Sequence, residues 1–195
     1  MKGYFGIGVD GVTKAMNVGT LMRTAHAFGA GFVFTVNAQY RVRPGTGTDT
    51  SDTPSSVPTW HFPDAQALRL PAGCRLVGVE ITDAAVDLPS FRHPRMAAYV
   101  LGGEREGLSP AVQALCDHIV RIPTRFSVNL GVAGAIVMYD RLLTLGRFAE
   151  RPVGSTGPVV PLEIPAFGEP LWKRKAARRA AKAALAAAAS GGARE

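Results

Sequence analysis

Short apolar runs alternate along the chain with longer segments whose apolar residues recur at helical spacing. The short runs predict strands, because apolar runs bounded by turn residues are typical of strands buried on both faces. They cover residues 4–9, 32–36, 74–80, 96–101 and 117–122. Helices are predicted over residues 17–29, 64–70 and 127–147, with one more beginning at Ser109 and Pro110. This alternation predicts an α/β fold with a mostly parallel sheet and helices on both faces.

Residue types at the helix ends refine these boundaries. Asn17 is a residue type that caps helices, and we expect it to cap the helix over 17–29. Ser127 is expected to open the last helix, with Asn129 in its first turn. Gly131 and Gly134 follow, and they would let a neighbouring element pack closely against this helix.

Proline, glycine and charge divide the chain into parts. Residues 1–150 are expected to form one domain, in which the polar stretch 41–58 predicts a long loop that is functional or mobile. Residues 151–170 contain five prolines and three glycines and predict a linker. Residues 171–195 form an alanine-rich tail with seven basic residues and one acidic residue. The net charge of +7 therefore describes a basic appendage on a nearly neutral domain.

Composition narrows the class of protein further. An apolar content of 47% is enough for a buried core and excludes global disorder. The sequence has no apolar run long enough to span a membrane, and the N-terminus does not resemble a signal peptide. Two cysteines cannot form a disulfide framework or a metal site of their own. We therefore expect a soluble cytoplasmic protein without a bound metal.

The run Gly6-Ile-Gly8-Val-Asp-Gly11 matches the dinucleotide fingerprint G-x-G-x-x-G, but its context argues against such a site. That fingerprint requires an acidic residue about 20 positions further on, at the end of the second strand, to bind a ribose. The second predicted strand ends at Val36, and the next acidic residue is Asp49, within the predicted loop. A turn at the end of a strand is the better interpretation.

Two clusters of residues that could bind a ligand or take part in catalysis occur where predicted strands give way to loops or helices. N-V-G-T-L-M-R-T-A at 17–25 contains Asn17 and Arg23, and a guanidinium on such a helix could grip a phosphate. L-G-G-E-R-E-G-L-S at 101–109 places Glu104 after a buried strand, among glycines that would let the backbone approach a ligand. Each cluster also has an ordinary interpretation, as a solvated arginine beside a cap or as a strand–turn–helix junction.

A third cluster is I-P-T-R-F-S-V-N at 122–129, where a strand ends and the last helix is expected to begin. Taken alone, it reads as a helix cap with a tight helix–strand contact. Open α/β sheets form their sites at the carboxyl ends of the strands, however, and all three clusters follow this rule. Their combination predicts a single site.

The three motifs N-x-G-x-x-x-R-T-A, L-G-G-E-x-x-G-L-S and I-P-x-x-x-S-x-N resemble those of the SpoU/TrmH family, in the SPOUT class of methyltransferases. The likeness runs from about Gly3 to Arg147 and departs at Gly131, where the family often has serine. It implies a C-terminal trefoil knot that binds S-adenosylmethionine. It also implies a homodimer with the active site between subunits, and methyl transfer to a ribose 2′-hydroxyl of RNA.

The resemblance also implies roles for individual residues. Arg23 would hold the phosphate beside the target ribose and stabilise the developing oxyanion, and Glu104 would orient Asn17 or Arg23. The residues implied in catalysis are Arg23, Asn17, Glu104, Ser127 and Asn129. Those implied in cofactor binding are Val79, Leu101, Gly102, Gly107, Ile122, Ser127 and Leu130. The RNA-binding candidates, some of them in the loop and the tail, are Arg23, Arg41, Arg43, Lys173, Arg174 and Arg178.

Other functions compete with this hypothesis. Transfer RNA is the favoured substrate, because short family members without an added domain act on it, but ribosomal RNA stays open. A non-catalytic RNA-binding homologue is a second possibility, which the presence of all five catalytic candidates disfavours. A nucleotide-dependent oxidoreductase is a third, which the missing ribose-binding acid disfavours.

Overall fold

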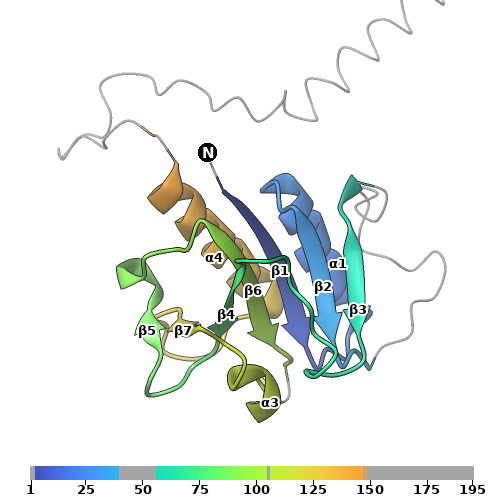
Figure 1. Cartoon of the computed structure of the whole chain (residues 1–195). Helices are drawn as coiled ribbons and strands as arrows, with labels where there is room; N and C mark the ends of the chain where they lie inside the picture. The colour runs from blue at the N-terminus through green and yellow to red at the C-terminus, as the bar shows by residue number, and fades with distance from the viewer. Residues whose placement is uncertain (1–2, 40–55, 105, 147, 149–195) are drawn as a thin grey trace, which may run out of the picture. The chain divides into compact units, whose positions relative to one another are not determined.

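A computed structural model describes residues 3–39, 56–104, 106–146 and 148 of the chain (Figure 1). The strands within these residues are β1 (Tyr4–Asp10), β2 (Phe32–Val36), β3 (Thr59–Phe62), β4 (Arg75–Val79), β5 (Val86–Asp87), β6 (Met96–Gly102) and β7 (His118–Arg121). The helices are α1 (Ala15–Ala27), α3 (Pro110–Gln113), α4 (Leu130–Leu145) and the short 3₁₀ helix η1 (Leu88–Ser90). The predicted linker, the basic tail and most of the predicted loop lie outside the described residues.

The strands form one sheet in the order β3-β2-β1-β6-β4-β7-β5. Each pair of neighbouring strands in it is parallel, which confirms the predicted parallel α/β sheet. In a parallel sheet all carboxyl ends point to one edge. The loops that follow β1, β4, β6 and β7 therefore come together at that edge, although the chain separates them widely.

Helices cover the two faces of this sheet unequally (Figure 1). The helices α1 and α4 lie on one face, where Leu21 and Val137 pack with Ile7 and Tyr99 of the strands. On the other face, Val112 of the one-turn helix α3 and the segment 62–74 cover Phe34 and its neighbours. The central strands are thus buried on both sides, which explains their nearly continuous apolar runs.

Packing explains the glycines of the rejected dinucleotide fingerprint. A Cβ atom on Gly6 would collide with the ring of Phe32, and one on Gly8 would collide with Phe34. These glycines make room for two aromatic rings on the neighbouring strand β2. The interpretation of this run as a structural feature is consistent with that packing.

Two predicted helix starts are wrong. The helix predicted over 17–29 begins at Ala15, with Lys14 in the cap position, so Asn17 lies buried inside the first turn and does not cap it. The last helix begins at Leu130, not at Ser127, and its cap is Asn129, whose Oδ1 accepts the backbone N–H of Gly131 at 2.9 Å. Serine and asparagine are both good caps, so residue type alone could not choose between them.

The helix predicted over 64–70 is also absent. The segment forms a turn in which the Asp64 side chain accepts the backbone N–H of Ala67 at 2.8 Å. The strands β3 and β5 were not predicted, because β3 is partly exposed at the sheet edge and β5 has only two residues.

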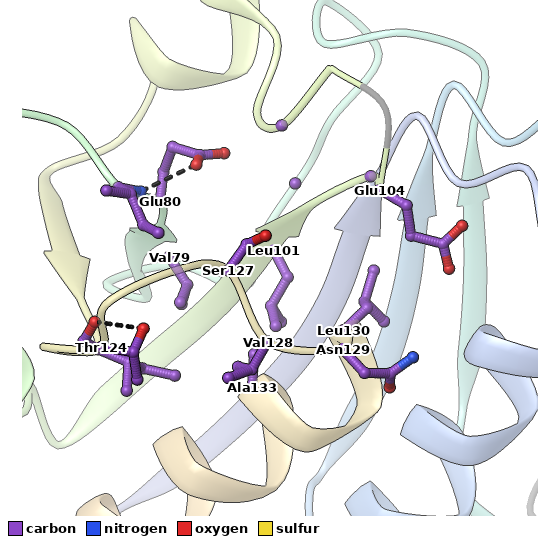
Figure 2. Close-up of a pocket in the computed structure, with 15 residues that line it drawn as sticks. Val79, Glu80, Leu101, Glu104, Thr124, Ser127, Val128, Asn129, Leu130 and Ala133 are labelled. Carbon is purple, nitrogen blue, oxygen red and sulfur yellow. Dashed lines mark hydrogen bonds between the residues drawn. The ribbon is translucent and has the colours of Figure 1, made fainter.

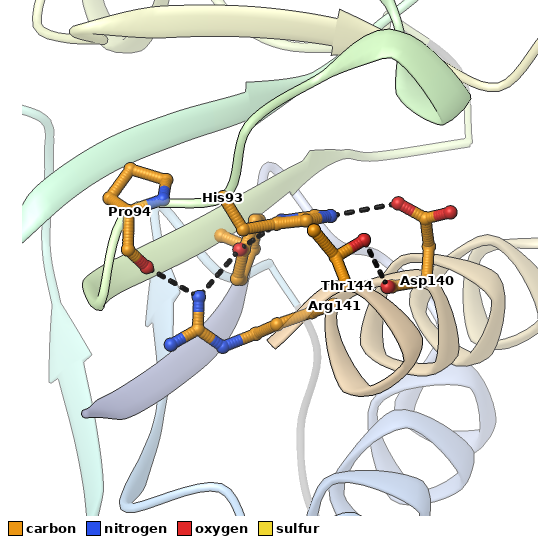
Figure 3. A network of polar contacts seen from close by, with 6 residues as sticks. His93, Pro94, Asp140, Arg141 and Thr144 are labelled. Atoms are coloured by element: carbon orange, nitrogen blue, oxygen red, sulfur yellow. Dashed lines mark hydrogen bonds and ion pairs between the residues drawn. The ribbon is translucent and has the colours of Figure 1, made fainter. Parts of the chain in front are cut away.

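A buried polar network ties α4 to β6 and to the segment before β6 (Figure 3). The His93 ring lies between the Tyr99 hydroxyl, at 2.6 Å, and the Asp140 carboxylate, at 2.8 Å. The buried Arg141 guanidinium donates to the carbonyl of Pro94 at 2.6 Å and to the Tyr99 hydroxyl at 3.1 Å. Because the partners come from separate elements, the network fixes how α4 packs on the sheet.

The stability of the protein is expected to fall when the solution is acidified below about pH 6.5, the ordinary pKa of histidine. Burial lowers the pKa of His93 in the folded state, and the nearby Asp140 only partly opposes this. The unfolded chain therefore takes up a proton before the folded chain does, so stability is complete above the unfolded pKa and declines below it. Urea unfolding from about pH 7.5 to about pH 5 measures the slope, which is at most about 1.4 kcal/mol per pH unit for one proton.

The variant His93→Asn serves as the control for this prediction, because it keeps the other three histidines. The free energy of unfolding of the variant is expected to depend less steeply on pH. Equal slopes in the two proteins would contradict the assignment of this effect to His93.

Candidate functional site

A pocket of about 460 Å³ lies at the carboxyl edge of the sheet, beyond β4, β6 and β7 (Figure 2). Three chain segments form its walls: the end of β4, the loop between β6 and α3, and the stretch that joins β7 to α4. The lining residues are Val79, Glu80, Ile81, Leu101, Gly102, Gly103, Glu104, Gly107, Ile122, Thr124, Ser127, Val128, Asn129, Leu130 and Ala133. This is the edge at which open α/β sheets bind their ligands.

The structure brings most of the candidate residues together in this pocket. All seven residues that the sequence suggested for cofactor binding line it: Val79, Leu101, Gly102, Gly107, Ile122, Ser127 and Leu130. Of the five catalytic candidates, Glu104, Ser127 and Asn129 line it as well. The pocket has apolar side chains on one side and backbone and carboxylate groups on the other, a combination that suits a ligand with both an aromatic and a polar part.

Three glycines allow the loop after β6 to take its shape. Gly107 has a φ of +68°, in the left-handed region that favours glycine. A Cβ on Gly102 would collide with the backbone of Gly107 and Leu108. A Cβ on Gly103 would lie 2.7 Å from the carbonyl oxygen of Gly11, in the loop after β1. The pocket wall at this point is therefore bare backbone.

Two asparagines link the pocket to α1. Asn129 donates from its Nδ2 to the Oδ1 of Asn17 at 3.3 Å while it caps α4. Asn17 is only 7% exposed and is not among the residues that line the pocket. The helices approach closely here, because a Cβ on Gly131 would lie 2.8 Å from the Cγ2 of Thr20. The expectation that the glycines of α4 permit close packing is confirmed.

Glu104 lines the pocket on the same side as Asn129 (Figure 2). Its carboxylate forms an ion pair with Lys14 at 3.2 Å. Within the described part of the chain, the ionic partner of Glu104 is thus Lys14. That Glu104 orients Asn17 or Arg23 stays a prediction. Lys14 was not among the predicted site residues.

Arg23 does not join the other candidates. It is exposed on α1, outside the pocket lining, and no other described residue pairs with its guanidinium. Of the other RNA-binding candidates, Arg41, Arg43, Lys173, Arg174 and Arg178 lie outside the described residues.

Two acidic residues near the pocket were not among the site residues suggested by the sequence. Glu80 follows β4 and lines the pocket, and Asp10 ends β1 and is buried. Each accepts a backbone N–H of the loop after β6. The signal that could have found them is an acidic residue directly at the end of an apolar strand, where its burial requires a partner.

Other kinds of site find no support in the described residues. No three His, Cys, Asp or Glu side chains there lie close enough to hold a metal ion. Burial raises the pKa of the Cys116 thiol to about 11 and raises that of Cys74 as well, so neither is a ready nucleophile. None of the described helices has the length and hydropathy to cross a membrane.

A sequence model of the SpoU rRNA Methylase family matches residues 5–139. An uncharacterised tRNA/rRNA methyltransferase of Synechocystis is 34% identical over 68% of this chain and 36% of its own length. The tRNA (guanosine(18)-2′-O)-methyltransferase of Escherichia coli is 28% identical over 68% of this chain and 60% of its own length. The chain therefore spans between about one third and two thirds of these relatives.

Solved structures agree with this result. The SpoU methyltransferase AviRb from Streptomyces viridochromogenes, in complex with the cofactor AdoMet, superposes with a TM-score of 0.65 and 25% identity. The match covers 73% of this chain and 58% of that one. The TrmH/SpoU tRNA modifying enzyme of A. aeolicus shares the fold at a TM-score of 0.59 and 19% identity, over 74% of this chain and 76% of that one.

Proposed function

The chain belongs to the SpoU rRNA methylase family, and from this premise we propose that it transfers the methyl group of S-adenosylmethionine to a ribose 2′-hydroxyl of RNA. The observation that carries the proposal is the pocket, where all seven residues suggested for the cofactor, Ser127 among them, meet beside the catalytic candidates Glu104 and Asn129. The reaction is supported by a relative named as a tRNA 2′-O-methyltransferase. The cofactor is supported by the AviRb structure in complex with AdoMet.

The residues of the pocket fit this cofactor. The volume of about 460 Å³ lies within the range of ordinary small-molecule sites. Leu101, Val128 and Leu130 supply an apolar wall for an adenine ring, and the bare backbone at Gly102 admits polar groups at close range. When bound, S-adenosylmethionine would supply a methyl group already activated by a sulfonium centre.

The chain's own residues would then position the ribose and stabilise charge. Glu104 and Asn129 stand at the α1 side of the pocket, where Asn17 supports Asn129. Arg23 would bind the phosphate beside the target ribose and stabilise the oxyanion as the hydroxyl loses its proton. A guanidinium keeps its proton in proteins and is a poor base, so Arg23 would act through its charge.

We also propose that two subunits build each active site. Arg23 lies outside the pocket lining of its own subunit, and in this proposal the α1 of a second copy supplies the arginine. The helix α4 carries an exposed apolar stripe, Val132, Tyr139 and Leu143, at the spacing of one helix face. A second copy of the chain would cover this stripe. As a separate part of the proposal, the chain would form the C-terminal trefoil knot that the family resemblance implies.

The variant Tyr139→Glu is expected to dissociate this dimer. A charge without a partner in an apolar interface costs about 3–5 kcal/mol, so the dissociation constant rises by at least about 100-fold. Sedimentation velocity over a range of concentrations measures it. Leu115→Glu is the matched control, because Leu115 and Tyr139 are each 48% exposed and Leu115 follows α3, away from the stripe. A dimer that persists in Tyr139→Glu would contradict the assignment of α4 to the interface.

RNA is the proposed partner, with tRNA favoured over rRNA. The exposed residues Arg125 and Phe126, the latter 77% exposed, lie in the chain between the pocket-lining residues Thr124 and Ser127. Such a pair suits a phosphate and a stacked base. Arg41 and Arg43 of the loop and Lys173, Arg174 and Arg178 of the tail stay predicted RNA contacts. The division into a catalytic domain (1–150), a linker (151–170) and a tail (171–195) and a cytoplasmic location are likewise proposals.

Calorimetry and methylation assays test the function. S-Adenosylmethionine is expected to bind to the purified protein and NAD is not, whereas the reverse would favour an oxidoreductase. With labelled donor, the protein is expected to methylate riboses in either the tRNA or the rRNA of cells that lack it, and mapping the modified nucleotide identifies the substrate. Binding of RNA without any methyl transfer to either fraction would support a non-catalytic homologue.

A further inference from the structure

Two carboxylates hold the loop that leaves β6 from opposite sides. Oδ2 of Asp10 accepts the backbone N–H of Ser109 at 2.7 Å, and Oε2 of Glu80 accepts the backbone N–H of Leu108 at 2.7 Å. Because β6 lies between β1 and β4 in the sheet, the ends of those two strands place one acid on each side of the loop. We refer to Asp10 and Glu80 as the carboxylate clamp.

The loop between β6 and α3 needs an external restraint. Gly102, Gly103 and Gly107 permit its shape, but glycine loses more conformational freedom on ordering than any other residue. The loop lies directly against both acids: a Cβ on Gly102 would lie 2.6 Å from Oε2 of Glu80, and one on Gly103 would lie 2.9 Å from the carbonyl oxygen of Asp10. The clamp therefore acts where the backbone is intrinsically loose.

Backbone N–H groups are the main hydrogen-bond partners of the carboxylate clamp. Asp10 is only 2% exposed, and neither Asp10 nor Glu80 forms an ion pair with a basic side chain of the described residues. The second oxygen of Glu80 accepts the backbone N–H of Ile81 at 2.9 Å. Hydrogen bonds to an ionised acceptor are roughly twice as strong as neutral ones, so two consecutive amides of the loop are firmly held.

We propose that Asp10 and Glu80 are positioning residues that hold the glycine loop in the shape that receives the methyl donor. The inference rests on the proposed function, because the end of β6 and the loop after it supply Gly102, Gly103 and Gly107 to the pocket. A loop already ordered before binding has less entropy to lose when the ligand arrives, which raises affinity. The clamp thus contributes to donor affinity mainly by shaping the loop.

The variants Asp10→Asn and Glu80→Gln test this role, because each keeps the size of the side chain and removes its charge. Each is expected to weaken the binding of S-adenosylhomocysteine by about tenfold in calorimetry, the difference between a charged and a neutral hydrogen bond. In the protein without ligand, the amides of Leu108 and Ser109 are expected to exchange hydrogen faster, while amides in the middle of β1 and β6 exchange as before.

Asp117→Asn is the matched control. Asp117 also accepts a strand amide, the N–H of Leu76 at 2.8 Å, but it does so just before β7 and not at the pocket. Its loss is expected to lower the thermal midpoint without changing ligand affinity or the exchange of Leu108 and Ser109.

Two affinity results and one hydrogen-exchange result would contradict the inference. Unchanged affinity in both clamp variants would overturn it, and so would an equal loss of affinity in Asp117→Asn. If the unmodified protein binds neither S-adenosylhomocysteine nor S-adenosylmethionine, the proposed function fails. The exchange of Leu108 and Ser109 then still decides whether the clamp holds the loop, and unchanged exchange in the variants would overturn that part.

Discussion

Replacement of Gly102 by valine is expected to weaken the binding of S-adenosylmethionine by about 100-fold or more while leaving the sheet folded. A Cβ at this position collides with the backbone of Gly107 and Leu108, and backbone cannot rotate away as a side chain can. The loop after β6 would have to move away from β6, and the pocket wall would move with it. Calorimetric titration of the variant with the methyl donor measures the loss.

Gly31→Ala provides the comparison for this experiment. A Cβ on Gly31 would meet its nearest atom, the carbonyl oxygen of Phe5, at 3.6 Å, which is an ordinary contact. Gly31 precedes β2 and does not line the pocket, so its variant is expected to bind the donor as the unmodified protein does. Donor binding by Gly102→Val at the unmodified affinity would show that the ligand does not use this wall.

Replacement of Arg23 by alanine is expected to lower the turnover rate by about 10²–10³-fold, the usual cost of removing one charge-stabilising donor from a transition state. Donor affinity should stay unchanged, because Arg23 does not line the pocket that would hold the donor. Arg23→Lys is expected to recover part of the rate, since the charge on the phosphate and oxyanion is retained. Steady-state methyl transfer and donor calorimetry on the same preparations separate the two effects.

Arg92 offers a matched control, because it is another exposed arginine outside the pocket lining. Arg92→Ala is expected to keep the full turnover rate. An equal loss of turnover in Arg23→Ala and Arg23→Lys would count against a role through charge alone. Unchanged turnover in Arg23→Ala would remove Arg23 from the site.

Mixing the two defective proteins tests whether one active site uses two subunits. A dimer that combines one Arg23→Ala subunit with one Gly102→Val subunit has one site with an intact pocket and an intact arginine from opposite chains. If subunits exchange freely, about a quarter of the original activity should return, because half of the dimers are mixed and each has one complete site. If Arg23 serves the pocket of its own chain, no mixture regains activity.

Local pattern alone was enough to predict the central strands and the position of the site along the chain. The strands β1, β2, β4, β6 and β7 follow from apolar runs that a parallel sheet buries on both faces. The site residues could be suggested because glycine, Glu104 and Asn129 follow the ends of such strands, and because three motifs resemble those of one family. Whether these residues perform the proposed roles is for the variants above to establish.

The tertiary structure decided what depends on contacts between distant segments. Asn17 looks like a helix cap in the sequence, but it is buried against Asn129, which is itself the cap of α4. Ser127 and Asn129 have similar local preferences, so only the packing of α4 against α1 could select the helix start.

The carboxylate clamp shows most clearly which features follow from the sequence and which depend on the tertiary structure. Asp10 and Ser109 are 99 positions apart, and Glu80 and Leu108 are 28 apart. The sequence determined that each acid ends an apolar strand, because periodicity and residue type are local properties. Only the strand order placed β6 between β1 and β4 and so brought both acids to one loop, because the pairing of strands is settled by the burial and hydrogen bonding of the whole sheet.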